Sequence, residues 1–278
     1  MSDHPEVICS QDKETNFFIY TKYKTNARPL SEYALQWPDY KNEKIIMEAS
    51  PGYFYGGNAT ATEIKDKCNN PKILVMLREP ADRLYSFFQR KKEMLFLPED
   101  ISLEKYIAQC NSYSDAQLVE EKNHMYTGVV FGHYSKHLNE WYQAFGSNLR
   151  VSFFDDLREP RKFMKELSTW LGIDASFYDT YNFDVKNKSG KYKNKLIHTV
   201  AVKLNFGLQR FWRNNPQLKK KLRDTYYSIN RGNKKVSADD SETIVKNKLR
   251  EHYKPYNKQL ADILTKNGIT KLPGWLQN

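Results

Sequence analysis

The sequence contains no apolar run long enough to cross a bilayer. Its first residues, Met1–Pro5, also lack the basic and apolar regions of a signal peptide. We therefore expect a soluble, cytoplasmic protein. Cysteine is scarce as well, because Cys9, Cys68 and Cys110 are too few and too scattered for a disulfide framework or a zinc site. We expect buried thiols, with a single disulfide as the alternative.

Several motifs of familiar enzyme classes are missing. No Gly-x-x-x-x-Gly-Lys-Ser/Thr motif occurs, which disfavours a P-loop kinase. Among the six histidines only His133 and His137 lie one helical turn apart, and we interpret that spacing as packing rather than metal ligation. We expect no metal cofactor. Internal repeats, low-complexity tracts and linkers are also absent, so residues 1–278 are predicted to form one domain.

Acidic residues are missing from one long stretch. Between Val185 and Arg223 the chain has twelve Lys and Arg and no Asp or Glu, whereas the rest is close to neutral within a total charge of +11. Such a patch attracts anions, whether nucleotide phosphates, acidic glycans, nucleic acid or an anionic membrane surface. The alternative is an ordinary solvated helical face. We favour anion binding because no acid balances the charge.

The residues that are present alternate between short apolar runs and longer periodic segments, which is typical of a mostly parallel sheet covered by helices. Strands are predicted at Lys44–Glu48, Ile73–Leu77 and Arg150–Phe154. Polar residues follow each strand, as expected when ligands bind at the carboxyl ends of parallel strands.

Apolar residues at helical spacing predict four long helices. These run from Val130 to Phe145, from Pro160 to Leu171, onward from Leu196, and from Leu249 to Ile263. We interpret their aromatic and leucine stripes as core.

Arg78 stands between the predicted strand Ile73–Leu77 and a helix that begins near Pro80. Free N–H groups at the helix N-terminus and the Arg78 guanidinium would together bind a phosphate, and the Ser86 hydroxyl could donate a further hydrogen bond. The alternative is a structural ion pair of Arg78 with Glu79 or Asp82, with Ser86 facing solvent.

Several segments, in their order along the chain, carry a resemblance to a known family. They are His4–Val7 with Lys13–Phe18, Glu48–Phe54, Leu77–Ser86, Gly132–Trp141, Asp155–Leu157 with Pro160, and Asn187–Tyr192. Together they resemble the sulfotransferases that use 3′-phosphoadenylyl sulfate (PAPS), particularly carbohydrate sulfotransferases of the heparan sulfate type and their bacterial relatives. The resemblance covers most of the chain.

The resemblance implies an α/β fold, a three-layer parallel sheet flanked by helices of the P-loop NTPase-like sulfotransferase type. It implies PAPS as the donor, adenosine 3′,5′-bisphosphate as the product, and no metal. Arg78 and Ser86 would bind the 3′-phosphate of the nucleotide. Gly190, Lys191 and Tyr192 look like the later cofactor loop of the family, although Gly190 could equally be an ordinary turn glycine.

Glu14 matches the glutamate that acts as general base in the glycan branch of the family. An acceptor hydroxyl has a very high pKa and must lose its proton as it attacks sulfur, which is a task for a carboxylate. The alternative is an exposed Lys13–Glu14 pair of little consequence.

The chain departs from the family pattern in two places. The glycine-rich loop that binds the 5′-phosphosulfate, and the strand before it, are absent, so we expect weak activity or none from this sequence and a fold without its first strand and loop. Ala49 stands where heparan-type enzymes usually have lysine. We therefore favour another hydroxyl-bearing acceptor, such as a bacterial surface glycan, a glycolipid or a small metabolite.

Three functions are compared. The first is a PAPS-dependent sulfotransferase acting on an acceptor hydroxyl of a glycan, glycolipid or related metabolite. The second is a catalytically silent nucleotide- or polyanion-binding protein of the same fold. The third, nucleic-acid binding through Lys186–Arg223, is disfavoured because Leu196, Val200 and Leu204 make that segment a packed helix.

Overall fold

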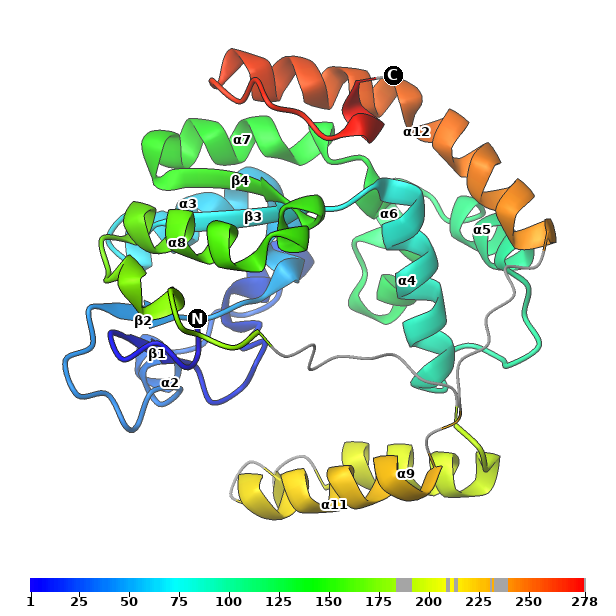
Figure 1. Ribbon diagram of the computed structural model, residues 1–278. Coiled ribbons are helices and arrows are strands. Elements are labelled where there is room, and N and C mark those ends of the chain that lie inside the picture. The colour runs from blue at the N-terminus through cyan, green and yellow to red at the C-terminus, as the bar shows by residue number, and fades with distance from the viewer. Residues whose placement is uncertain (184–191, 209–210, 213–214, 231, 233–239, 278) are drawn as a thin grey trace.

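The computed structural model describes residues 1–183, 192–208, 211–212, 215–230, 232 and 240–277 (Figure 1). The strands are β1 (Val7–Cys9), β2 (Ile45–Met47), β3 (Ile73–Leu77) and β4 (Leu149–Phe153). The helices before β4 are α1 (Tyr20–Tyr23), α2 (Leu30–Ala34), α3 (Gly57–Lys67), α4 (Pro80–Glu93), α5 (Leu103–Asn111), α6 (Asp115–Leu118) and α7 (Ser135–Phe145). After β4 come α8 (Pro160–Leu171), α9 (Lys195–Gly207), α11 (Pro216–Asn230) and α12 (Asp240–Lys266).

The strands of the described residues are parallel and form two separate pairs. In one pair β1 lies beside β2, with Val7 opposite Ile45. In the other β3 lies beside β4, with Ile73 opposite Leu149 and Leu77 opposite Phe153. The predicted α/β class with parallel strands is therefore confirmed. The strand predicted at residues 44–48 is shorter by one residue at each end, and the strand predicted at residues 150–154 begins and ends one residue earlier. The three-residue strand β1 was not predicted.

The β3–β4 pair lies between two layers of helix. Val75 and Leu77 of β3 pack against Leu138 and Trp141 of α7 in one buried cluster, to which α3 and α12 also contribute. On the other face the Arg150 guanidinium donates to the backbone oxygen of Glu166 in α8. Figure 1 shows α7 and α8 on either side of this pair and α12 running along α7 and α4.

The two faces of β3 are not equally buried. A five-residue apolar run predicts a strand buried on both faces, yet Leu74 and Met76 are 39% and 38% exposed. Alternate side chains of a strand point to opposite faces. Val75 and Leu77 pack into the cluster on the α7 side, while Leu74 and Met76 point to the opposite face and stay partly exposed.

The helices follow the predicted periodicity closely. Helix α8 spans the predicted residues, and the α4 helix begins at Pro80 as expected. The segment predicted as one helix from Val130 to Phe145 is instead a 3-10 turn, Val130–Gly132, followed by α7. At this break Gly132 lies so close to the ring of Tyr253 that a Cβ atom there would be 2.5 Å from it.

The three cysteines are free thiols, as predicted, although Cys110 alone is fully buried and Cys9 and Cys68 are half-buried. None of the helices in the described ranges is both long enough and apolar enough to traverse a bilayer.

Candidate active site

Arg78 directly follows β3, at the carboxyl end of the strand, and its backbone oxygen accepts a hydrogen bond from the hydroxyl of buried Tyr134 (2.9 Å). Its guanidinium carbon lies 4.8 Å from the centroid of the Phe154 ring, which follows β4. A cation over an aromatic face is held in place without losing its charge or all its hydrogen-bond donors. Within the described residues Arg78 has no ion pair.

The acids that could have neutralised Arg78 are engaged elsewhere. The Glu79 carboxylate accepts from the backbone N–H groups of Ala81 and Asp82 at 3.0 and 2.8 Å, and so caps α4. Arg250 of α12 lies 3.8 Å from Glu79 and 3.6 Å from Asp82. Arg78 therefore does not form the structural ion pair with Glu79 or Asp82 that was the alternative.

The same cap corrects the predicted anion site. We expected free N–H groups at the start of α4, but Glu79 occupies two of them. A carboxylate at a helix N-terminus satisfies the donors and the helix dipole that a phosphate would otherwise use. Any anion at this edge must therefore rely on side chains.

Ser86 provides one such side chain. It lies in α4, is exposed, and its hydroxyl has no hydrogen-bond partner in the part of the chain that the structure describes. At a rise of ~1.5 Å per residue, Ser86 is roughly 9 Å along the helix from Pro80. Arg78 and Ser86 thus lie at one helix, with Arg78 at its start.

Glu14 is exposed, whereas the residues that follow it are partly or fully buried. The contacts of these following residues determine where Glu14 lies. The hydroxyl of Thr15 donates to the Glu48 carboxylate at 2.6 Å, and Ser50 donates to the same oxygen at 2.8 Å. The Tyr33 hydroxyl donates to the other oxygen at 3.1 Å. Glu48 thus anchors the segment that carries Glu14.

The Tyr53 hydroxyl completes this anchor. It lies 3.1 Å from the Thr15 hydroxyl and accepts the backbone N–H of Phe18 at 3.2 Å. Burial and the nearby Glu48 carboxylate raise the pKa of Tyr53 to about 12, so the phenol stays protonated. No sequence pattern predicts the roles of Thr15, Tyr33 and Tyr53, because they come together with Glu48 only through loops of different length.

A cluster of nitrogen-bearing side chains, which the sequence analysis also missed, lies near Glu14. Lys91, near the end of α4, is 8% exposed, and its ammonium nitrogen is 2.7 Å from Nε2 of His124. Burial lowers the pKa of Lys91, while the Glu14 charge acts in the opposite direction. Burial likewise lowers the pKa of Lys22 to about 8 and, with Lys91 and Lys22 nearby, that of His124.

The structure therefore brings two predicted parts of the site to one helix. Arg78 and Ser86 lie at the start and middle of α4, and the Glu14 charge is felt at Lys91 near its end. The basic side chains of the last turn of α4 are Arg90, Lys91 and Lys92.

The predicted cofactor loop is only partly described. Gly190 and Lys191 lie outside the described residues. The Tyr192 hydroxyl donates to Glu99 at 2.8 Å, and its ring stacks on His198 with centroids 4.1 Å apart. Tyr192 is thus engaged by these neighbours rather than by Arg78 or Ser86.

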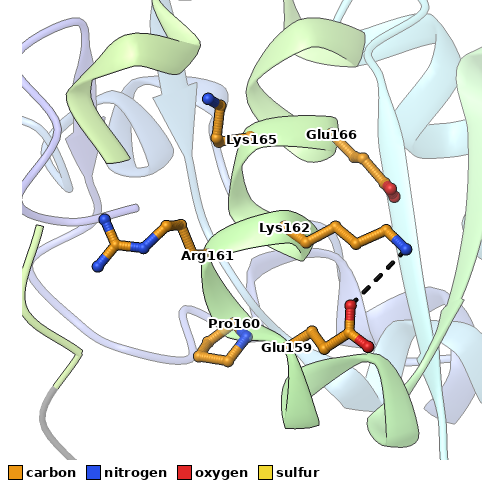
Figure 2. A pocket seen from close by; sticks show the side chains of 6 residues that line it. All are labelled: Glu159, Pro160, Arg161, Lys162, Lys165 and Glu166. Carbon is orange, nitrogen blue, oxygen red and sulfur yellow. Dashed lines mark ion pairs between the residues drawn. The ribbon is translucent and has the colours of Figure 1, made fainter. Parts of the chain in front are cut away.

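A surface depression at the start of α8 does not belong to this site. Figure 2 shows its six lining side chains pointing in different directions, with Lys162 paired to Glu159 at 3.7 Å and Arg161 turned away from both. A binding site needs polar groups that converge on one point. This depression has none, so we assign it no function.

The histidines behave as packing residues, as we interpreted His133 and His137. His133 stacks on Tyr256 with centroids 3.8 Å apart, and His137 packs against Phe54 and Tyr55. In the described ranges, no three side chains of His, Cys, Asp or Glu gather where a metal ion could bind.

Comparison with known proteins adds a family to this geometry. The family model described as "Sulfotransferase domain" matches residues 62–240, more than half of the chain and the part that contains Arg78 and Ser86. Glu14 lies before the matched range.

A curated relative and a solved structure are also similar. The bifunctional heparan sulfate N-deacetylase/N-sulfotransferase 1 of Caenorhabditis briggsae is 27% identical over 190 residues, which are 64% of this chain and 21% of that protein. The chain therefore spans about a fifth of the length of this relative. The crystal structure of a sulfotransferase from Alicyclobacillus acidocaldarius aligns with a TM-score of 0.57 at 19% identity, over 76% of this chain and 86% of that chain, and it supports the fold.

Proposed function

Because the chain belongs to the sulfotransferase domain family, we propose that it transfers a sulfuryl group from PAPS to a hydroxyl of a glycan, glycolipid or related metabolite. One observation carries the proposal. Arg78 stands at the carboxyl end of β3 with no ion pair among the described residues, while both neighbouring acids are engaged by the α4 cap and by α12. An unneutralised guanidinium at a strand end suits a phosphate of the donor.

In this proposal Arg78 and Ser86 bind the 3′-phosphate. The guanidinium supplies planar donors and a permanent charge, and the exposed Ser86 hydroxyl supplies one further hydrogen bond. Gly190, Lys191 and Tyr192 remain predicted contacts to the nucleotide. Tyr192 would have to leave Glu99 to make such a contact.

Glu14 acts as the general base. The acceptor oxygen forms a new bond to sulfur as the bond from sulfur to the bridging oxygen of the donor breaks, and adenosine 3′,5′-bisphosphate leaves with that electron pair. The proton of the acceptor hydroxyl passes to the Glu14 carboxylate. The anchor through Thr15 and Glu48 fixes the backbone next to Glu14.

Lys91 places positive charge near Glu14, and Lys22 adds charge near His124, the neighbour of Lys91. Charge accumulates on the transferred group and on the leaving oxygen during such a transfer, so cations nearby stabilise the transition state. The name of the Caenorhabditis briggsae relative includes heparan sulfate, which supports a glycan acceptor. Ala49 favours an acceptor other than heparan sulfate.

Calorimetric titration with adenosine 3′,5′-bisphosphate tests the nucleotide site independently of turnover. Arg78→Ala should weaken binding by about 10- to 100-fold, the loss of a charge-assisted contact. Arg223→Ala, which removes an exposed arginine of α11, is the matched control and should bind like the parent protein. Equal affinity of Arg78→Ala and the parent would refute the assignment.

A transfer assay with radiolabelled donor and a panel of glycans and lipids tests the chemistry. Glu14→Gln should keep nucleotide affinity and reduce turnover by about 10²- to 10⁴-fold, as is usual for loss of a general base. Glu32→Gln, at another exposed glutamate, is its control. Turnover of Glu14→Gln near that of the parent would assign the base to another residue.

A further inference from the structure

Helices α9 and α11 form a hairpin that projects from the rest of the molecule (Figure 1). Helix α9 contacts the end of α4 and the chain just after it, both near its own start and near its own end. Nε2 of His198 lies 2.8 Å from the backbone oxygen of Glu93, and Phe206 packs against Phe96 with ring centroids 5.5 Å apart. The side chain of His198 is 8% exposed, so this side of α9 is the one that faces the body.

The hairpin exposes apolar side chains in stripes. On α9, Leu196, Val200 and Leu204 recur every fourth residue and are 77%, 56% and 52% exposed. On α11 the stripe consists of Leu218, Leu222 and Ile229, which are 43%, 50% and 59% exposed. Residues at this spacing share one helix face, which in a globular protein normally packs into the core. Here both stripes face solvent, an arrangement that marks an interaction surface.

Basic residues flank these stripes. The described lysines and arginine at 193, 195, 203, 219, 221 and 223 are all exposed. They belong to the stretch from Val185 to Arg223 that contains twelve Lys and Arg and no acid. At the end of the hairpin Phe211 is 45% exposed next to Trp212. Apolar stripes, flanking cations and terminal aromatics together are typical of helices that lie in a membrane interface.

We propose that the α9–α11 hairpin docks on the surface of an anionic membrane. The six aliphatic side chains enter the boundary between head groups and acyl chains, and the lysines and arginines contact the lipid phosphates. The helices lie on the bilayer rather than cross it, since no helix in the described ranges meets the requirements for a span.

Charge and apolar surface together distinguish an anionic membrane from two other possible partners, a second copy of the chain and a nucleic acid. A second copy of the chain would bring two strongly basic hairpins together, and like charges at an interface oppose association. A nucleic acid would satisfy the cations, but it offers nothing apolar to cover Leu196, Val200 and Leu204. An anionic membrane satisfies both kinds of side chain.

Vesicle co-sedimentation of the full chain tests the proposal. Vesicles of phosphatidylcholine alone are compared with vesicles containing about one third phosphatidylserine, at low and high salt. We expect at least a tenfold higher partition coefficient on the anionic vesicles, with a loss of most of this gain at high salt.

Two variants separate the apolar and the electrostatic contributions. Leu196→Ser combined with Val200→Ser and Leu204→Ser should lower the partition coefficient at least tenfold while keeping the charge. Lys219→Glu combined with Lys221→Glu should also lower the partition coefficient at least tenfold, while keeping the apolar stripes. The matched control, Lys258→Glu with Lys266→Glu on α12, makes the same charge change on a different surface and should bind like the parent. The four substituted lysines are exposed and pack into no core, so the charge variants remain informative if the serine variant unfolds.

Three outcomes would overturn the proposal. Absence of binding to anionic vesicles is the first. The second is a loss on the α12 control equal to that on the hairpin charge variant, because the effect would then reflect net charge alone. The third is concentration-dependent dimerisation in light scattering, or salt-sensitive retention of single-stranded RNA, that the hairpin variants abolish while vesicle binding is unchanged.

Discussion

Buried His133, whose ring contacts the exposed His252, predicts how the stability of this protein depends on pH. Nε2 of His133 lies 3.0 Å from Nε2 of His252, and His133 is 5% exposed beneath the ring of Tyr256. Burial, followed by the proximity of His252 and Lys136, lowers the pKa of His133 to about 3. Burial also lowers the pKa of His252. Only one ring can donate in this contact while both are neutral.

The sign follows from proton linkage. With a pKa of about 3 when folded and about 6.5 when unfolded, His133 binds a proton only in the unfolded state over the range between these values. The free energy of unfolding therefore falls as pH decreases from about 6.5 to about 3 and is unaffected above about pH 7.5. At about pH 5 the loss from His133 alone is at most about 2 kcal/mol, with a slope of about 1.3 kcal/mol per pH unit.

Urea denaturation at a series of pH values measures this slope. His133→Phe keeps a ring against Tyr256 but cannot bind a proton. Near pH 5 the slope of its free energy of unfolding against pH should therefore be smaller than that of the parent protein, by the amount that corresponds to about one proton. Above about pH 7.5 the two slopes should coincide, which is the internal control. Parallel slopes at all pH values would show that His133 is not a buried neutral histidine.

Two further substitutions test the packing around the candidate site. Gly132→Ala places a methyl group 2.5 Å from the fully buried Tyr253 ring, so we expect a destabilisation of about 1–3 kcal/mol in urea denaturation. Gly207→Ala, where no atom lies within 4 Å, should not destabilise, and equal effects would refute the steric argument. Lys22→Met removes an ammonium whose pKa burial lowers to about 8. Since a lowered pKa means that the folded state disfavours the charge at pH 7, the variant should be more stable by about 1–2 kcal/mol; a loss of stability on urea denaturation would indicate a bound partner for Lys22.

The sequence by itself determined the local structure. Apolar spacing and the terminal Pro160 and Gly172 delimit α8 because a helix of this length contains its own start and stop signals. The run Ile73–Leu77 predicted β3, and the resemblance carried by short segments identified the family. The three-residue strand β1 escaped prediction, since so short a strand has no periodicity to detect.

Tertiary structure decided which side chains share the site. The sequence left open whether Glu79 would pair with Arg78, and only the fold showed that its carboxylate caps α4 and lies beside Arg250, more than 170 residues away along the chain. The anchor of the Glu14 segment on Glu48 likewise joins separate loops. Such contacts depend on how elements pack in space, for which the spacing of residues along the chain carries no signal. The same holds for the apolar stripe on α9. Its periodicity predicted a packed helix, and the fold instead left it in solvent.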